Sequence, residues 1–212
     1  MHIKPTKHRT ERGYTMIETI MYISILGILG VILAGYAQRG FARYLTGRTA
    51  QQIIDLKRAV LQYTAVKESY ETLSISEMAA AKAIPLDMRD ATTYAHHALG
   101  GAVRLGPAFE HSKAKDNTSA KATNKYMFYI TFENVPKNSC AEILTDGQFY
   151  GDGGDIDSLI INDEVYYYEN SFFEVDETKK LDNKITQGRL SVEQAVKACS
   201  KPNSNTITWI FS

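Results

Sequence analysis

Residues 12–37, RGYTMIETIMYISILGILGVILAGYA, decide how this chain of 212 residues is organised. From Thr19 to Ala37 the sequence runs for 19 residues without a charge, close to the roughly 20 that a helix needs to cross a hydrocarbon core. One carboxylate, Glu18, stands directly before this run. An ionisable side chain near the apolar interior of a membrane costs free energy, which makes it a candidate functional residue. The stretch therefore predicts a membrane-spanning helix with Glu18 as its first candidate site residue.

The 13 residues before Tyr14 are polar and basic, which predicts a leader peptide that is removed and takes no part in the fold. An ordinary secretory signal is the alternative, because residues 35–37, GYA, form a small-x-small cleavage site. Against this alternative, the apolar run is longer than the roughly 7 to 15 residues of a signal-peptide core and carries Glu18 at its start. The two interpretations predict different first residues for the mature chain, Tyr14 or Gln38.

The charges of the chain balance, with 24 Lys and Arg residues against 24 Asp and Glu residues. Residues 14–212 contain 20 basic and 23 acidic residues and no basic block. This composition gives no support for nucleic-acid binding. Arg39, Arg43 and Arg48 follow the apolar run closely, so the positive-inside rule orients the helix only weakly.

Cys140 and Cys199 are the two cysteines of the chain, and their spacing fits no compact metal-ligand pattern. An even pair behind a membrane-insertion segment predicts one disulfide in an oxidising compartment, which would place the C-terminal part outside the cytoplasm. Two unrelated buried thiols are the alternative. We treat residues 140–199 as a cysteine-bounded region.

The helical pattern continues beyond Ala37. Six apolar residues recur at spacings near multiples of 3.6, with charged residues between them. They are Phe41, Leu45, Ile53, Leu56, Val60 and Tyr63. We therefore predict one helix over residues 14–66, apolar all round over 14–37 and amphipathic beyond, with its apolar stripe against a globular head formed by residues 67–212.

The head mixes short helices with strands. Ser74 and Glu77 have the spacing of a capping box, which predicts a helix over residues 74–82 with Pro85 at or just after its end. Alternation and β composition predict most of the other elements. These are strands at 101–106, 125–135 and 206–211, a hairpin over 158–169 turning at Asn162 and Asp163, a helix over 139–147, a helical turn over 191–199, and a surface loop over 111–124. We predict an α+β fold, with an antiparallel sheet packed on the long helix.

No catalytic or nucleotide-binding motif occurs in the sequence. His96 and His97 are adjacent, and neighbouring strand residues point to opposite faces, which disfavours a shared metal site. Residues 152–157, DGGDID, lack the ligand order of a calcium loop. The tyrosines at 166–168 suit sheet or subunit packing. We predict no cofactor, no metal and no enzymatic activity.

Residues 13–18, GYTMIE, followed by a long apolar helix, resemble the processing site of type IV prepilins. This similarity covers roughly residues 9–40. Looser similarity to the type IVb branch, which includes toxin-coregulated, bundle-forming and conjugative thin pili, extends further along the chain. The mature length of about 199 residues is similar to that of this branch, and so are the segment 83–88, the strand entry at 100–101 and the segment 135–140.

The resemblance implies cleavage after Gly13 by a prepilin peptidase and N-methylation of Tyr14. It also implies the pilin fold, with a bridge between Cys140 and Cys199 that holds the final segment of the head. The new ammonium at Tyr14 would be buried in an apolar fibre core, where it needs a counter-charge. Glu18, one helical turn further on, would supply it and would fix the axial register of an incoming subunit. A solvated interfacial glutamate is the alternative.

Gly27 and Gly35 match positions between which related fibres show locally melted helix. Melting there is one expectation, since glycine costs about 1 kcal/mol of helix propensity relative to alanine. The alternative is that these glycines only allow close packing of helices.

On this resemblance, the chain is a major pilin of a type IVb pilus that assembles with copies of itself and supports adhesion, aggregation or conjugation. Its partners would be the prepilin peptidase, the inner membrane before assembly and the pilus assembly machinery. The precursor would lie in the inner membrane with its head in the periplasm, and the fibre on the surface of a Gram-negative bacterium. A minor pilin or a type II secretion pseudopilin is the first alternative, and a signal-anchored periplasmic protein the second.

Overall fold

The computed structural model describes residues 15–65, 69–91, 94–108, 126–146, 156–168, 184–185 and 190–212. The leader, the predicted loop at 111–124 and most of the stretch 152–157 lie outside this part. The chain divides into two compact units, Met1–Phe41 and Ala42–Ser212.

The helices are α1 Met16–Thr64, α2 Ile75–Ala80, the 3-10 helix η1 Leu86–Met88, α4 Lys137–Thr145 and α5 Val192–Ala198. The strands are β1 Arg89–Asp90, β2 Tyr94–Ala95, β3 Val103–Pro107, β4 Phe128–Val135, β5 Ile156–Ile161, β6 Glu164–Tyr168, β7 Lys184–Ile185 and β8 Asn205–Phe211. The helix predicted over residues 14–66 is therefore present as one element of 49 residues, α1.

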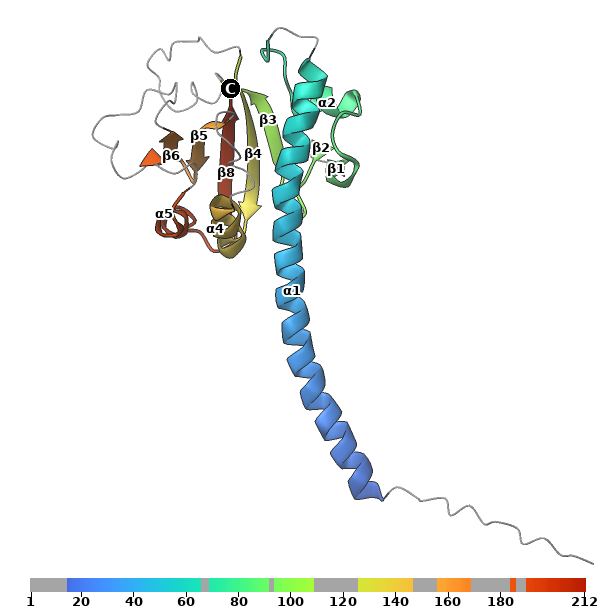
Figure 1. Ribbon diagram of the computed structural model, residues 1–212. Coiled ribbons are helices and arrows are strands. Elements are labelled where there is room, and N and C mark those ends of the chain that lie inside the picture. The colour runs from blue at the N-terminus through green and yellow to red at the C-terminus, as the bar shows by residue number, and fades with distance from the viewer. Residues whose placement is uncertain are drawn as a thin grey trace, which may run out of the picture. The chain divides into compact units, whose positions relative to one another are not determined.

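The main sheet has the strand order β3-β4-β8-β5-β6-β7, and β1 pairs with β2 in a small second sheet. Figure 1 shows the last strand of the chain, β8, running between β4 and β5. The predicted antiparallel sheet is confirmed for the pairs from β3 to β6. The short strand β7 differs, because it pairs with β6 in parallel. The fold is α+β.

One face of this sheet packs on the part of α1 that belongs to the second unit. Side chains from α1, from alternate positions of the strands and from α4 and α5 form one buried cluster, as period-2 alternation in strands requires. Its largest members include Trp209, Phe128, Phe132, Ile53 and Leu56. Phe132 meets Trp209 edge-on at 5.5 Å between ring centroids and anchors the centre of the core.

The apolar stripe predicted for the amphipathic half of α1 is partly wrong. Ile53, Leu56 and Val60 are buried, but Phe41 is 62% exposed and belongs to the first unit. The buried stripe of α1 also contains four polar residues. They are Thr46, Thr49, Gln52 and Thr64.

The helix α2 begins as predicted, with Ser74 Oγ accepting a hydrogen bond from the Glu77 N–H at 3.2 Å. It ends before Pro85. Lys82 adopts a left-handed φ of 56°, and its N–H donates to the Ala79 carbonyl at 3.0 Å. A residue of this conformation after the last turn is a standard helix stop, so the backbone turn and not the proline ends α2.

The predicted hairpin of β5 and β6 is confirmed, with Asn162 and Asp163 at φ of 49° and 78°. Two positive φ values suit the primed turn that matches the twist of a two-residue hairpin. The α5 helix carries the reciprocal capping box of Ser191 and Gln194. The predicted strand at 125–135 corresponds to β4, which begins three residues later and ends at Val135 as predicted. The predicted helix at 139–147 corresponds to α4, which begins and ends two residues earlier.

Candidate functional site

The α1 residues of the first unit form a helix whose apolar side chains are exposed. The helix contains a window long and apolar enough to cross a membrane, and none of that window is buried. Its exposed large apolar residues are Met16, Ile17, Ile20, Met21, Tyr22, Ile23, Ile25, Leu26, Ile28, Leu29, Val31, Ile32, Leu33, Tyr36 and Phe41. A helix that is apolar all round requires an apolar surrounding, either lipid or other protein.

Glu18 lies in the first turn of α1 and is exposed. Its N–H donates to the Thr15 carbonyl at 3.0 Å and lies 3.4 Å from Thr15 Oγ1, so Thr15 caps the helix. A carboxylate in a first turn is favoured by the partial positive charge of the helix N-terminus. Gly13 and Tyr14 lie outside the described residues, so the pairing of Glu18 with the Tyr14 ammonium stays a prediction.

Gly27 and Gly35 lie within α1, which is helical through both positions. A Cβ added at either residue would meet nothing within 4 Å. The single chain thus makes no steric demand for glycine at these positions. Melting and close packing both stay predictions about the assembled state.

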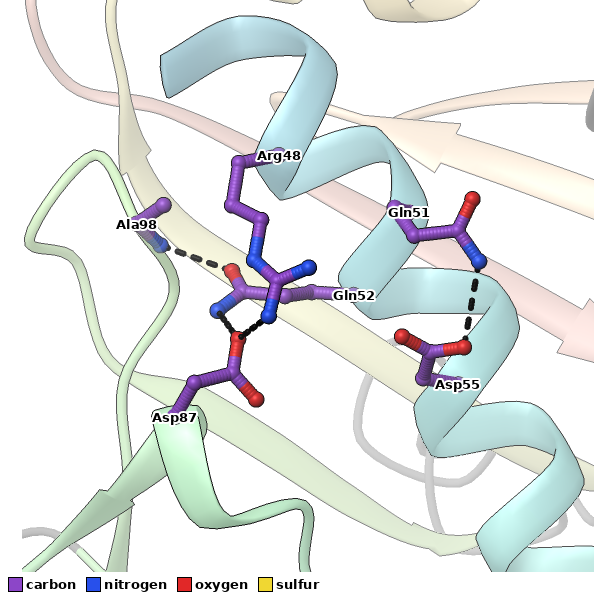
Figure 2. A network of polar contacts seen from close by, with 6 residues as sticks. All are labelled: Arg48, Gln51, Gln52, Asp55, Asp87 and Ala98. Atoms are coloured by element: carbon purple, nitrogen blue, oxygen red, sulfur yellow. Dashed lines mark hydrogen bonds and ion pairs between the residues drawn. The ribbon is translucent and has the colours of Figure 1, made fainter. Parts of the chain in front are cut away.

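A polar cluster ties α1 to the head within the second unit, and Figure 2 shows its members. Asp87 Oδ2 accepts from Arg48 Nη2 and from Gln52 Nε2, each at 2.8 Å. The carbonyl oxygen of the same Gln52 amide, Oε1, accepts a hydrogen bond from the Ala98 N–H at 2.7 Å. Gln52 therefore joins α1 to η1 and to the loop before β3.

Electrostatics favour the charged form of Asp87. Partial burial alone would raise the pKa of its carboxyl, but the hydrogen bond from Gln52 and the charge of Arg48 outweigh it and hold the pKa below the ordinary value. Gln51, next to Gln52, makes a different contact: it donates to Asp55 of the same helix at 3.1 Å.

The disulfide predicted between Cys140 and Cys199 is present, with 6.0 Å between the Cα atoms. It joins α4 to the residue that follows α5. Ser139, next to Cys140, shares a hydrogen bond of 2.8 Å with Thr46 of α1. The bridge and this hydrogen bond fasten α1, α4 and α5 to one another.

His97 is buried in the packing of the head, and both of its ring nitrogens have partners there. Its Nδ1 accepts from the Leu99 N–H at 3.2 Å, so the ring proton lies on Nε2, which donates to the Glu133 carbonyl at 2.8 Å. Burial lowers the pKa of the imidazole more strongly than the Glu133 carbonyl raises it. A Cβ at Gly101 would overlap both Glu133 O and His97 Nε2, so this contact requires glycine.

Sequence reasoning missed Thr46 and Gln52 as structural residues, whereas for His97 it favoured a surface or packing role, and His97 is packed in the head. Thr46 and Gln52 could have been found, because they occupy positions of the helical stripe that includes Leu56 and Val60 and yet are polar. Tyr166, proposed as packing, is buried, and its pKa is raised by burial and by Glu164. Among the described residues no group of three or more His, Cys, Asp or Glu side chains could hold a metal ion.

The model of the PilS N-terminal family matches residues 46–212. The chain is also similar to the crystal structure of TcpA, a type IV pilin from Vibrio cholerae El Tor biotype, at 14% identity and a TM-score of 0.48, over 80% of this chain and 99% of that one. A type IV b pilin from Salmonella typhi is similar at 16% identity and a TM-score of 0.45, over 77% and 95%. Both scores are below 0.5, so the family assignment rests on the family model. No curated protein matches the chain.

Proposed function

The chain belongs to the PilS N-terminal family and is a pilin subunit, and we propose that it is the major structural subunit of a type IVb pilus. The observation that carries this proposal is the bare apolar helix of the first unit, with Glu18 in its first turn. Its surface suits a lipid bilayer before assembly and the helices of other subunits afterwards. Family membership points to a structural protein rather than an enzyme.

Assembly follows from the chemistry at the start of α1. We propose that a prepilin peptidase cleaves after Gly13 and that the Tyr14 amino group is then N-methylated. A buried ammonium without a partner is costly by several kcal/mol, so an incoming subunit is most stable where its terminus meets a Glu18 carboxylate. Axial register and charge neutralisation then have the same cause.

The division of labour along the chain is part of this proposal. Residues 14–37 form the membrane span and later the fibre core, and residues 67–212 form the head outside. The Cys140–Cys199 bridge favours an oxidising compartment, which is the periplasm of a Gram-negative bacterium in our proposal. The assembly machinery extracts the subunit from the inner membrane into a surface fibre.

The first test replaces Glu18 with Ala or Gln in cells that depend on this subunit. Removing one member of a buried ion pair costs about 3 to 5 kcal/mol. Since about 1.4 kcal/mol corresponds to a factor of ten in an equilibrium constant, the amount of subunit in sheared surface fibres should fall by a factor of about 100 or more. Ser24→Ala is the matched control, since Ser24 is exposed on the same helix and bonds only within it, to the Ile20 carbonyl.

Mass spectrometry of the mature terminus completes the test. N-methyl-Tyr14 in wild type and in the Glu18 variants would show that processing is intact and that assembly is the step lost. A mature chain that begins at Gln38, or normal fibres from Glu18→Ala, would contradict the proposal. A chain present only at trace levels in sheared fibres would favour a minor pilin or a pseudopilin.

A further inference from the structure

The outer face of the main sheet, opposite the face that packs on α1, carries a row of aligned residues. Arg104 of β3 pairs with Thr131 of β4, Thr131 with Thr208 of β8, and Thr208 with Ile160 of β5. Residues paired across strands project from the same face. These four residues line a hollow of about 230 Å³.

The centre of this row offers hydroxyl groups. Thr131 Oγ1 and Thr208 Oγ1 share one hydrogen bond of 2.7 Å. Each hydroxyl has one proton and two lone pairs, so this bond uses one of the two protons. Both residues line the hollow with a small exposed part, 5% for Thr131 and 2% for Thr208. Thr206 of the same strand lines the hollow as well. The floor can therefore both donate and accept hydrogen bonds.

An aromatic ring, that of Tyr129, lies at one side of the hollow. Tyr129 is the cross-strand partner of Gly106, and a Cβ at Gly106 would lie 3.1 Å from Tyr129 Cε1 and Oη. The missing side chain lets the ring rest against β3. Tyr129 is half-buried and lines the hollow, so part of this amphipathic ring is presented to it.

The charged groups around the hollow are balanced. Arg104 Nε contacts Glu133 Oε1 at 2.7 Å, and Lys201 and Asp163 add one charge of each sign to the lining. Among the described lining residues, two are basic and two acidic. A polyanion would meet as many carboxylates as cations here, so the electrostatics favour a neutral ligand.

The rim beside Asn162 is held rigidly. Asn162 Nδ2 donates to Asn205 Oδ1 at 2.8 Å and to the Ala198 carbonyl at 2.9 Å, and its Oδ1 accepts from the Thr206 N–H at 3.1 Å. Asn205 is itself buried and donates to the Val135 carbonyl at 2.9 Å. A preformed rim lowers the entropy that a ligand must overcome on binding.

We propose that this hollow binds one ring of a neutral saccharide. Sugar hydroxyls both donate and accept, as do the threonines and the Arg104–Glu133 pair, and the apolar face of a sugar ring suits contact with the part of the Tyr129 ring that lines the hollow. The volume of about 230 Å³ is below the roughly 300 to 1,000 Å³ of pockets for drug-sized ligands, which fits a single ring. The site lies wholly in the second unit and does not depend on fibre assembly.

The test uses the full chain in micelles of lauryldimethylamine oxide, a detergent without a sugar headgroup. Saturation-transfer difference NMR is recorded with methyl glycosides of glucose, galactose, mannose and N-acetylglucosamine, and with N-acetylneuraminic acid as an anionic comparison. Arg104→Gln and Tyr129→Leu remove the two features argued to bind. Arg58→Gln is the control, because Arg58 is also exposed but lies on α1, outside the hollow.

At least one neutral glycoside should give a saturable signal. Arg104→Gln should weaken its affinity by about fivefold or more, as loss of a charge-assisted hydrogen bond does, and Arg58→Gln should leave it unchanged. Fluorescence of Trp209, the single tryptophan, verifies that each variant is folded. No saturable signal from any neutral glycoside, equal binding by Arg104→Gln, or preference for N-acetylneuraminic acid would overturn the proposal.

Discussion

Replacing Gln52 with Leu tests the polar cluster that ties α1 to the head. Gln52 is 1% exposed and uses both ends of its amide, toward Asp87 and toward the Ala98 N–H. Leucine fills a similar volume and makes neither bond. The substitution therefore removes hydrogen bonds without opening a large cavity.

The magnitude follows from the two bonds lost. Leaving the partly buried Ala98 N–H without its acceptor costs about 1 to 3 kcal/mol. The bond to Asp87 adds about 0.5 to 1 kcal/mol, because the Asp87 side chain is 35% exposed and keeps Arg48 as its partner in screening solvent. We expect the free energy of unfolding to fall by about 1.5 to 4 kcal/mol in total.

The assay is thermal unfolding of the full chain in detergent, followed by near-ultraviolet circular dichroism. At about 2 to 4 °C per kcal/mol for a protein of this size, the midpoint should fall by about 3 to 16 °C. Gln51→Leu is the matched control: Gln51 bonds only within α1, to Asp55, and such pairs contribute about 0.2 to 0.5 kcal/mol. Equal losses for the two variants would refute the reasoning.

Three further predictions concern the head. Replacing both Cys140 and Cys199 with Ser removes a bridge across about 60 residues, worth roughly 4 kcal/mol, and should lower the unfolding midpoint of the oxidised chain by about 8 to 16 °C; an unchanged midpoint would contradict it. Burial lowers the pKa of His97 below its ordinary 6.5, so the unfolded state binds more protons and stability falls as the pH drops below about 6.5. Denaturant titrations at several pH values should show a shallower loss in His97→Gln, and an identical slope would argue against this role. Gly101→Ala should lower the free energy of unfolding by at least about 2 kcal/mol, since its Cβ overlaps the Glu133 carbonyl. Gly100→Ala meets no atom within 4 Å and carries only the cost of φ +89°, about 1 to 2 kcal/mol. The reverse order of these two losses in a denaturant titration would be inconsistent with the packing described.

Elements with strong local signals were predicted well. The helical turn predicted over residues 191–199 is α5, and its start is fixed within four consecutive residues by the capping box of Ser191 and Gln194. Asn162 and Asp163 tolerate positive φ, so the hairpin turns there. The disulfide was also predicted, because only one pairing is possible between two cysteines.

The order in which the strands pair in the main sheet could not be predicted from the sequence. The strand predicted at 206–211 lies in the middle of the sheet, between β4 and β5, although it comes last in the chain. Its partners are separated from it by long stretches, and no local propensity encodes such pairing. The helix predicted over residues 74–82 is α2, Ile75–Ala80. The left-handed conformation of Lys82 that stops it was not predicted, because a non-glycine residue gives no local signal for that conformation.

The sequence by itself determined the long helix, its bare apolar half and the position of Glu18, because these depend on spacing along one chain and on the free energy of apolar surface in water. Only the tertiary structure decided which polar residues are buried and what they contact. Gln52 bonds to residues 35 and 46 positions away, and Thr131 and Thr208 meet across a register that neither strand specifies alone. Such contacts exist only once the strands have paired and the core has closed.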